Sequence, residues 1–259
     1  MTVRFTVTEG VARVEIDRPQ SLNAVDRATE AELIQIWKDI ENNRDIRVVV
    51  LTGSGERAFC VGADVKDTEP GLTGLQYWAA PRPGGFGGIA LRDTLDVPVI
   101  ARVNGHALGG GMEMVLGCDI VVAADNATFG LPEPRLARLA LDGGIATLVR
   151  RIPHVHAMGM LLTGRRISAA DAHAFGLVNE VVPLSELDSA VSRWAEDILL
   201  CAPLSIRAIK QMVRAGEKLT AKEAQMLRLP NLVESLGSAD QVEGVQAFVE
   251  KRQPNWQGR

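Results

Sequence analysis

The sequence predicts an α/β fold in which a largely parallel sheet is followed by a helical C-terminal region. Short apolar, β-branched segments recur over the first half of the chain with helical stretches between them. Such alternation requires crossover connections between parallel strands. Beyond about residue 182 there is no further convincing strand pattern, and the remaining periodicity is helical. A chain of 259 residues is long enough to bury one large core.

The first elements follow in chain order from their periodicity. Residues 4–17 (RFTVTEGVARVEID) alternate apolar and polar side chains around a Glu-Gly pair, which predicts a β-hairpin. Residues 26–41 place apolar side chains at helical spacing, which predicts a helix. Buried strands are then predicted within three segments: residues 46–53 (IRVVVLTG), 97–105 (VPVIARVNG) and 119–130 (DIVVAADNATFG).

The segment from Asp67 to Gly88 interrupts this rhythm. It contains Pro70, Pro81, Pro83 and six glycines, so we predict a long surface loop. Loops of that length inside a compact domain are usually functional lids or mobile segments.

The chain after residue 182 is expected to be helical apart from breaks near Pro203 and Pro230. We therefore predict a core over residues 1–195 and a C-terminal helical region over residues 196–259. The second region would be a helical subdomain or an arm that forms oligomers.

The composition excludes several classes of function. Hydrophobic residues make up 46% of the chain and charged residues 23%, which is ordinary for a globular protein. A net charge of -4 and a pI near 5.7 argue against nucleic acid as the main partner, because phosphate binding needs clustered positive charge. No apolar run reaches the roughly 18 residues of a membrane span, and the N-terminus lacks the apolar core of a signal peptide.

The three cysteines, Cys60, Cys118 and Cys201, are far apart in apolar or mixed surroundings. We expect reduced, mostly buried thiols in a cytoplasmic protein. The chain has no CxxC and no HExxH motif, so we expect no metal site.

The segment HALGGGMEM, from His106 to Met114, places three glycines just ahead of Glu113 between two apolar runs. Glycines weaken a regular element, so their use here suggests that something must approach the backbone closely. A helix beginning near Gly110 would expose unpaired N–H groups that can bind a phosphate or stabilise an oxyanion. Glu113 would lie in its first turn, either as a surface residue that complements the helix dipole or as a buried functional acid.

Two further motifs were weighed against this one. Gly53 and Gly55 superficially match a dinucleotide fingerprint, but residues 59–61 favour an extended path where that fingerprint needs a helix. Glu133 stands between two prolines, in FGLPEPRL, which predicts a rigid, non-helical segment. Glu133 is either a solvated turn residue or a carboxylate held still for chemistry; with Glu113 it would suit general acid/base work on an activated carbonyl compound.

These features occur together in a chain that resembles the crotonase (enoyl-CoA hydratase/isomerase) superfamily from about Val11 onward. The matching stretches are residues 16–26 (IDRPQSLNAVD), 48–66 (VVVLTGSGERAFCVGADVK), 98–133 (PVIARVNGHALGGGMEMVLGCDIVVAADNATFGLPE) and 161–182 (LLTGRRISAADAHAFGLVNEVV). The PGGFGGI segment and the last 17 residues look most like the carnitinyl-CoA dehydratase branch. The resemblance implies a crotonase-like ββα spiral core with a C-terminal helical trimerisation region.

The resemblance also implies roles for four residues. Backbone N–H groups of Ala63 and Gly110 would hold the thioester oxygen as it gains enolate charge. Glu113 and Glu133 would act on one water, with Glu113 activating the water and Glu133 delivering a proton to C2. The implied reaction adds water across the 2,3 double bond of an enoyl-CoA, or removes it.

Substrate-binding residues carry over in the same way, and coenzyme A is then part of the substrate, so no separate cofactor is expected. The residues implied to contact the acyl-CoA are Leu22, Ala24, Ala63, Asp64, Lys66, Gly109 and Gly110. Lys66 would pair with a CoA phosphate or be a solvated surface lysine. Lys251 matches a position that reaches a neighbouring subunit's CoA, and the resemblance implies a homotrimer or a homohexamer made of two trimers.

One segment departs from the family pattern. After the second glutamate the family usually has GxxPGxGG, whereas residues 137–144 are ARLALDGG, with Ala140 in place of the proline. The change puts the acyl group and the efficiency of hydration in doubt. Asp142 is an additional carboxylate near the site, which we interpret as the N-cap of the next helix rather than a catalytic group.

The four histidines have no convincing ligand spacing, and His106 is expected to pack beside a strand end. Two alternatives to hydration remain open: double-bond isomerisation by a single carboxylate, and a catalytically silent scaffold or nucleic-acid binder on the same fold.

Overall fold

The computed structural model describes residues 1–67, 73–80 and 82–259. A six-stranded sheet has the strand order β1-β2-β3-β5-β7-β10. The hairpin β1-β2 is antiparallel, and each further neighbouring pair is parallel. The bounds are β1 Val3–Thr8, β2 Val11–Ile16, β3 Val48–Gly53, β5 Val99–Val103, β7 Ile120–Ala124 and β10 Glu180–Val182. The predicted hairpin, the three buried strands and the largely parallel sheet are confirmed.

A second, smaller sheet has the order β4-β6-β8-β9, with β4, β6 and β8 parallel and β9 antiparallel to β8. Its strands are β4 Ala58–Cys60, β6 His106–Leu108, β8 Thr128–Gly130 and β9 Arg166–Ser168. Each of the first three follows a strand of the large sheet after a short connection. The periodicity did not reveal these strands because three residues are too few to show an alternation.

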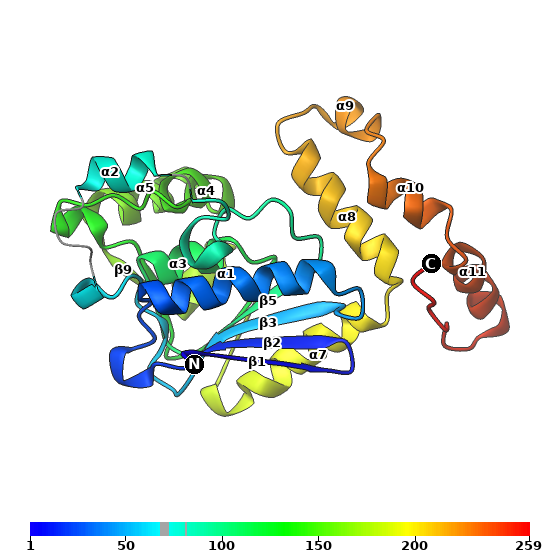
Figure 1. The fold of residues 1–259 in the computed structure, drawn as a ribbon, viewed down its shortest axis with the longest axis horizontal. Coiled ribbons are helices and arrows are strands. Elements are labelled where there is room, and N and C mark those ends of the chain that lie inside the picture. The colour runs from blue at the N-terminus through cyan, green and yellow to red at the C-terminus, as the bar shows by residue number, and fades with distance from the viewer. Residues whose placement is uncertain (68–72, 81) are drawn as a thin grey trace.

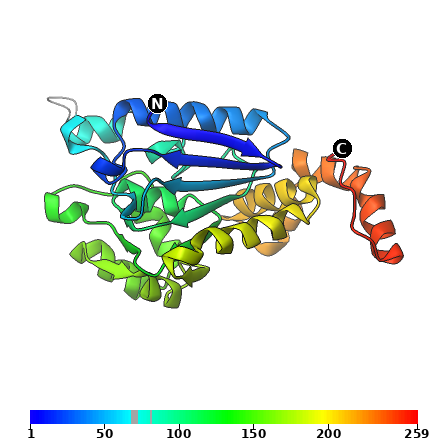
Figure 2. The same cartoon turned by 90° about the horizontal axis from the view of Figure 1, so that it is seen from below.

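The large sheet is covered on both faces, and β3 shows how its sequence produces this. Val49 and Leu51 belong to one core cluster, together with Leu33 and Trp37 of helix α1 (Arg27–Asn42). The intervening Val48 and Val50 belong to the second cluster, which includes residues of helix α7 (Leu187–Leu199). Because successive side chains of a strand point to opposite faces, a continuous apolar run is required. Figures 1 and 2 show α1 and α7 on either side of the sheet.

Helix α1 begins as the sequence predicts. The side chain of Asp26 accepts a hydrogen bond of 2.8 Å from the backbone N–H of Thr29. Such a bond satisfies one of the N–H groups that a helix start leaves unpaired. It also anchors the loop before α1, on which two predicted substrate contacts lie.

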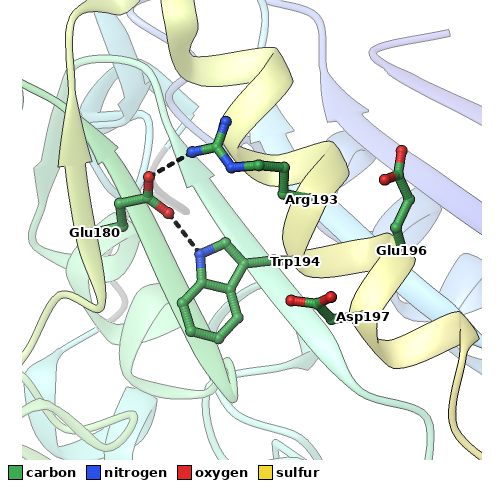
Figure 3. A pocket seen from close by; sticks show the side chains of 5 residues that line it. All are labelled: Glu180, Arg193, Trp194, Glu196 and Asp197. Carbon is green, nitrogen blue, oxygen red and sulfur yellow. Dashed lines mark hydrogen bonds and ion pairs between the residues drawn. The ribbon is translucent and has the colours of Figure 1, made fainter.

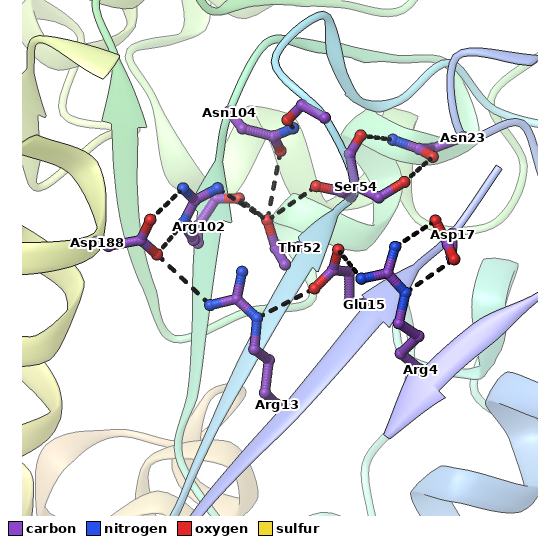
Figure 4. A network of polar contacts seen from close by, with 12 residues as sticks. Arg4, Arg13, Glu15, Asp17, Asn23, Thr52, Ser54, Arg102, Asn104 and Asp188 are labelled. Atoms are coloured by element: carbon purple, nitrogen blue, oxygen red, sulfur yellow. Dashed lines mark hydrogen bonds and ion pairs between the residues drawn. The ribbon is translucent and has the colours of Figure 1, made fainter. Parts of the chain in front are cut away.

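A polar network fixes the loops at the carboxyl ends of β2, β3 and β5 (Figure 4). Asn104 donates to the carbonyl oxygens of Gly55 at 2.7 Å and Ala58 at 3.0 Å. Arg102 pairs with Asp188 through two bonds of 2.8 Å, which ties β5 to α7. In parallel sheets, ligands bind outside the carboxyl ends of the strands, so this network supports the edge where a site is expected.

Shorter helices surround the carboxyl edge of the sheet. They are α2 Gly74–Ala79, α3 Gly110–Leu116, α4 Gly144–Arg151, α5 His154–Thr163 and α6 Ala169–Ala174. The chain then forms α8 Pro203–Gly216, α9 Ala221–Gln225, α10 Pro230–Leu236 and α11 Asp240–Glu250, which extend away from the sheets (Figures 1 and 2). Pro203 and Pro230 open α8 and α10, where a missing N–H costs no hydrogen bond, so the expected breaks and the helical tail are confirmed. The proposed boundary at residue 195 lies within α7 and stays a prediction.

The prediction of one continuous surface loop over residues 67–88 is wrong. Residues 68–72 and 81, and with them Pro70 and Pro81, lie outside the described residues. The described part of the segment includes α2, whose start carries reciprocal capping bonds between Thr73 and Gln76. It also includes a buried 3₁₀ helix over Phe86–Gly88. A capping Thr-x-x-Gln at positions 73–76 was the missed signal.

The thiols differ in exposure. Cys60 and Cys118 are buried, and Cys201, two residues after the end of α7, is exposed, so the thiols are mostly buried as expected. Among the described residues, no helix is both long and apolar enough to cross a membrane.

Candidate functional site

Helix α3 begins at Gly110, as the sequence predicts, and Glu113 lies buried in its first turn. Only 4% of Glu113 is exposed. Its Oε1 accepts a hydrogen bond of 2.9 Å from the backbone N–H of Gly144, the first residue of α4. The interpretation of Glu113 as a surface residue that complements the helix dipole is therefore excluded, and the backbone at the start of α4 fixes one of its carboxylate oxygens.

The glycines ahead of Glu113 permit close approaches on both sides. Gly109 has a φ of +57°, and a Cβ on it would stand 3.1 Å from Oε1 of Glu133. A Cβ on Gly111 would stand 2.0 Å from the carbonyl oxygen of Cys60 in β4. A side chain at Gly109 would displace Glu133, and one at Gly111 would separate α3 from β4. These close approaches explain why an otherwise apolar segment carries glycines.

Two backbone amides at this end of α3, those of Ala63 and Gly110, have no partner in the part of the chain that the structure describes. Val25 bonds to the backbone of Gly62 and Asp64 at 2.9 Å each, so the intervening N–H of Ala63 points away from Val25. A Cβ on Gly62 would stand 3.0 Å from the nitrogen of Gly110. Within the described residues neither the Ala63 nor the Gly110 N–H donates a hydrogen bond to a protein acceptor. Two neighbouring chain segments thus each offer a free donor.

Glu133 lies at the start of a 3₁₀ helix over Glu133–Leu136, so the expectation of a non-helical segment was wrong. Proline is tolerated in the first turn of a helix, where its missing N–H is not needed, and Pro134 occupies that position. Oε2 of Glu133 is buried without a hydrogen-bond partner among the described groups. An unpaired buried carboxylate oxygen is costly and requires an explanation such as an external ligand.

The acidity of both glutamates is altered. Burial, assisted by the negative charges of Asp142 and Glu133, raises the pKa of Glu113 to about 7 against the opposing bond from Gly144. Burial also raises the pKa of Glu133. A carboxylic acid with a pKa near neutrality can both accept and deliver a proton at physiological pH.

Asp142 is not the N-cap of α4, so that interpretation was wrong. The N-cap is Gly143, with no side-chain bond to the helix. The carboxylate of Asp142, only 7% exposed, instead accepts a hydrogen bond from the hydroxyl of Tyr77 and lies 3.7 Å from Nε of Arg82. Tyr77 and Arg82 therefore satisfy the Asp142 carboxylate, and no local sequence pattern could show these distant contacts.

The loop with Leu22 and Ala24 is fixed by a residue that the sequence analysis did not single out. Leu22 and Asn23 both have positive φ values, of 53° and 56°. The side chain of Asn23, fully buried, donates to the carbonyl oxygens of Ser54 at 3.0 Å and Ala58 at 2.7 Å. Asparagine tolerates this backbone conformation, and its position between two apolar residues was the available signal.

Arg18 was also missed, and it joins the two loops predicted to bind CoA. Its guanidinium donates to the carbonyl oxygen of Ala24 and pairs with Asp26 at 2.9 Å and Asp64 at 3.0 Å. The side chain of Asp64 is thus engaged within the protein. The predicted contact of Asp64 with substrate would therefore be made by its backbone.

The remaining predicted residues are less constrained. Lys66 is exposed, as both of its interpretations require, and Lys251 ends α11 far from the sheets. His106 lies in β6, beside the strand end as expected, with Nδ1 2.8 Å from Oγ1 of Thr128.

A separate hollow lies between β10 and α7, and none of the candidate catalytic residues lines it (Figure 3). Glu180, Arg193, Trp194, Glu196 and Asp197 line it. Glu180 already pairs with Arg193 at 2.6 Å and accepts from the Trp194 indole at 2.8 Å, so its carboxylate is satisfied.

Comparison with known proteins decides the family. The family described as Enoyl-CoA hydratase/isomerase matches residues 6–259. The chain belongs to the enoyl-CoA hydratase/isomerase family. Members act on acyl-CoA substrates, and the crotonase-like fold class predicted from the sequence is confirmed.

Individual family members resemble the chain over its full length. It is 36% identical over 262 residues to a carnitinyl-CoA dehydratase of Proteus mirabilis, covering 100% of this chain and 99% of that protein. It is 38% identical over 260 residues to an (E)-benzylidenesuccinyl-CoA hydratase of Thauera aromatica, covering 100% of both chains. The crystal structure of an enoyl-CoA hydratase from Bacillus anthracis superposes with a TM-score of 0.91 at 34% identity, again over 100% of both chains.

Proposed function

We propose that the protein adds water across the 2,3 double bond of an enoyl-CoA thioester, or removes water in the reverse direction. The observation that carries the proposal is the pair of acids: Glu133 presents a buried, unpaired Oε2, and Glu113 has a pKa of about 7. A Cβ on Gly109 would touch Glu133, and Gly109 directly precedes the free amide of Gly110.

In the proposed reaction the thioester oxygen accepts hydrogen bonds from the backbone N–H groups of Ala63 and Gly110. Glu113 takes a proton from water as the water oxygen bonds to C3, and Glu133 gives a proton to C2. The two amides stabilise the enolate that forms between these events. Loss of one such donor typically costs about 2.7–4 kcal/mol of barrier.

Binding of the CoA portion is assigned to loop backbone and to charge at the same edge. The loop held by Asn23 and Arg18 would present the backbone of Leu22 and Ala24. The exposed side chain of Lys66 would pair with a CoA phosphate.

The test is turnover of a panel of thioesters by the wild-type protein and by Glu113→Gln and Glu133→Gln. The panel contains crotonyl-CoA, carnitinyl-CoA, (E)-benzylidenesuccinyl-CoA and a longer straight-chain enoyl-CoA. We expect hydration of at least one, and a loss of about 10²-fold or more in each variant. Full activity in both variants, or no turnover of any thioester by the wild type, would refute hydration. Deuterium exchange at C2 or C4 without net hydration would instead indicate double-bond isomerisation.

We also propose that the C-terminal helices form the interface of a homotrimer or of a homohexamer built from two trimers. On α11, Val245, Phe248 and Val249 are 67%, 85% and 72% exposed. Contiguous apolar surface of this kind marks an interaction site. Light scattering should give three or six times the mass of 27.9 kDa, and a monomer at micromolar concentration would contradict the assignment.

A further inference from the structure

Tyr77 and Arg82 approach the acidic site by contacting the side chain of Asp142. Tyr77 of α2 donates its hydroxyl hydrogen to Oδ2 of Asp142. The Arg82 guanidinium lies 3.7 Å from the same oxygen and stacks 4.4 Å above the centre of the Tyr77 ring. Arg82 also pairs with Glu30 of α1. The three groups thus join α2, α1 and the loop before α4.

Asp142 is connected to Glu113 through the backbone of the loop before α4. Two residues after Asp142, the backbone N–H of Gly144 holds Oε1 of Glu113. A Cβ on Gly144 would stand 3.1 Å from that same oxygen, so the loop 142–144 lies directly against the acid. Asp142 is itself buried, and its carboxylate accepts a hydrogen bond from Tyr77 rather than contacting Glu113 directly.

We propose that Asp142 is a positioning residue that couples Tyr77 and Arg82 to Glu113. Tyr77 and Arg82 hold the carboxylate of Asp142, and Asp142, through the backbone of Gly144 and through its own negative charge, sets the orientation and proton affinity of Glu113. The inference rests on the proposed function, because it assigns the control of the water-activating acid. It gives a role to the loop 137–144, which departs from the family pattern. It also explains why α2 and Arg82 carry groups that reach inward.

The charges around Glu113 have opposite and separable effects. Asp142 and Glu133 are the negative charges that face it, and both raise its pKa. Arg82 neutralises part of the charge of Asp142, and Glu30 lies behind Arg82. Removing the charge of Asp142 should therefore make Glu113 more acidic, while removing Arg82 should make it less acidic.

The experiment measures the pH dependence of kcat/KM for the best thioester of the panel, in Asp142→Asn, Arg82→Leu and Tyr77→Phe. Because kcat/KM reports the free enzyme, its acidic limb follows ionisation of the acid pair that contains Glu113. We expect Asp142→Asn to move that limb down by about 0.5 pH unit or more, and Arg82→Leu to move it up. Tyr77→Phe keeps both charges, so it should lower kcat/KM several-fold and leave the limb in place.

Asp45→Asn is the matched control, because Asp45 is exposed beyond the opposite end of β3. A loss of fold alone would lower activity without moving the limb in opposite directions. Limbs that stay in place in both Asp142→Asn and Arg82→Leu, or that move in the same direction, overturn the inference.

A second readout separates this inference from the proposed function. The titration of Glu113 can be followed by carboxyl ¹³C NMR, with Glu113→Gln to assign the signal. We expect the same downward change in Asp142→Asn whether or not any thioester is hydrated. An unchanged Glu113 titration in a wild type that hydrates thioesters would refute the role of Asp142 and leave the proposed function intact.

Discussion

Replacing Glu113 by Gln should remove a loss of stability that the wild-type protein undergoes as the pH rises toward 7. In the folded protein the pKa of Glu113 is about 7, against 4.5 for an unperturbed glutamate. The folded state therefore holds the proton more tightly than the unfolded state. As the pH rises from about 4.5 to 7, the folded wild type must give up a proton that the unfolded chain has already lost, and the free energy of unfolding falls.

The size of the effect follows from the difference between the two pKa values. It corresponds to about 3 kcal/mol of lost stability above pH 7, since one pKa unit is about 1.4 kcal/mol. Glu113 is only 4% exposed, so solvent screens this penalty little. The glutamine variant cannot ionise, so it keeps this free energy at high pH.

The assay is urea unfolding of both proteins at a series of pH values from 4.5 to 8.5, at one protein concentration. The useful quantity is the stability of Glu113→Gln minus that of the wild type, because any fixed cost of burying the amide cancels between pH values. We expect this difference to rise by about 3 kcal/mol from pH 4.5 to pH 8. A difference that stays flat, or that falls with rising pH, would refute the assignment of Glu113 as a destabilised acid.

Three further predictions follow from the same geometry. Gly109→Ala should lower the free energy of unfolding by about 1–3 kcal/mol, because residue 109 has a positive φ. It should also reduce kcat by a larger factor than it weakens binding of a CoA thioester, because the new Cβ meets Glu133. Turnover and calorimetric binding of a CoA thioester separate the two effects, and normal turnover would contradict the prediction. Arg18→Gln should raise KM about tenfold with little change in kcat, since it loosens the loops with Ala24 and Asp64 but touches neither acid; an equal loss in kcat would count against this. Asp26→Ala should lower the free energy of unfolding by about 1 kcal/mol by removing the cap of α1, measured by urea unfolding with the exposed Asp45→Ala as control, and no change would contradict the role of the cap.

Most of the large sheet could be predicted from the sequence because its signals are local. Strand β3 needs apolar side chains on both faces, and its run of Val48 to Leu51 shows this without further information. The cap at Asp26 and the helix start at Gly110 are equally local, since each depends on groups within four residues. Strands of three residues, such as β6, have no measurable period and were not found.

The contacts that complete the site join distant segments, and for that reason the sequence did not reveal them. Asp142 before a glycine pair has the local appearance of a helix cap, but its partners are Tyr77 and Arg82, about 60 residues earlier. Glu113 was identified as a functional candidate, yet its donor Gly144 lies 31 residues further along the chain. Local chemistry fixes which groups are available, whereas tertiary packing decides which of them meet.

The two glutamates are best considered as one titrating pair. Each is made less acidic by burial, and the charge of Glu133 further opposes ionisation of Glu113. When two such groups interact, the first proton leaves more readily than the second, so over a range near neutral pH the pair holds one proton and one negative charge. Addition of water needs one group to accept a proton and one to donate, and a singly protonated pair supplies both. The unpaired Oε2 of Glu133 leaves that group free for an external partner, whereas Gly144 fixes Glu113. The pair is therefore asymmetric before any substrate arrives: the backbone holds Glu113, and Glu133 keeps one oxygen open to an external donor.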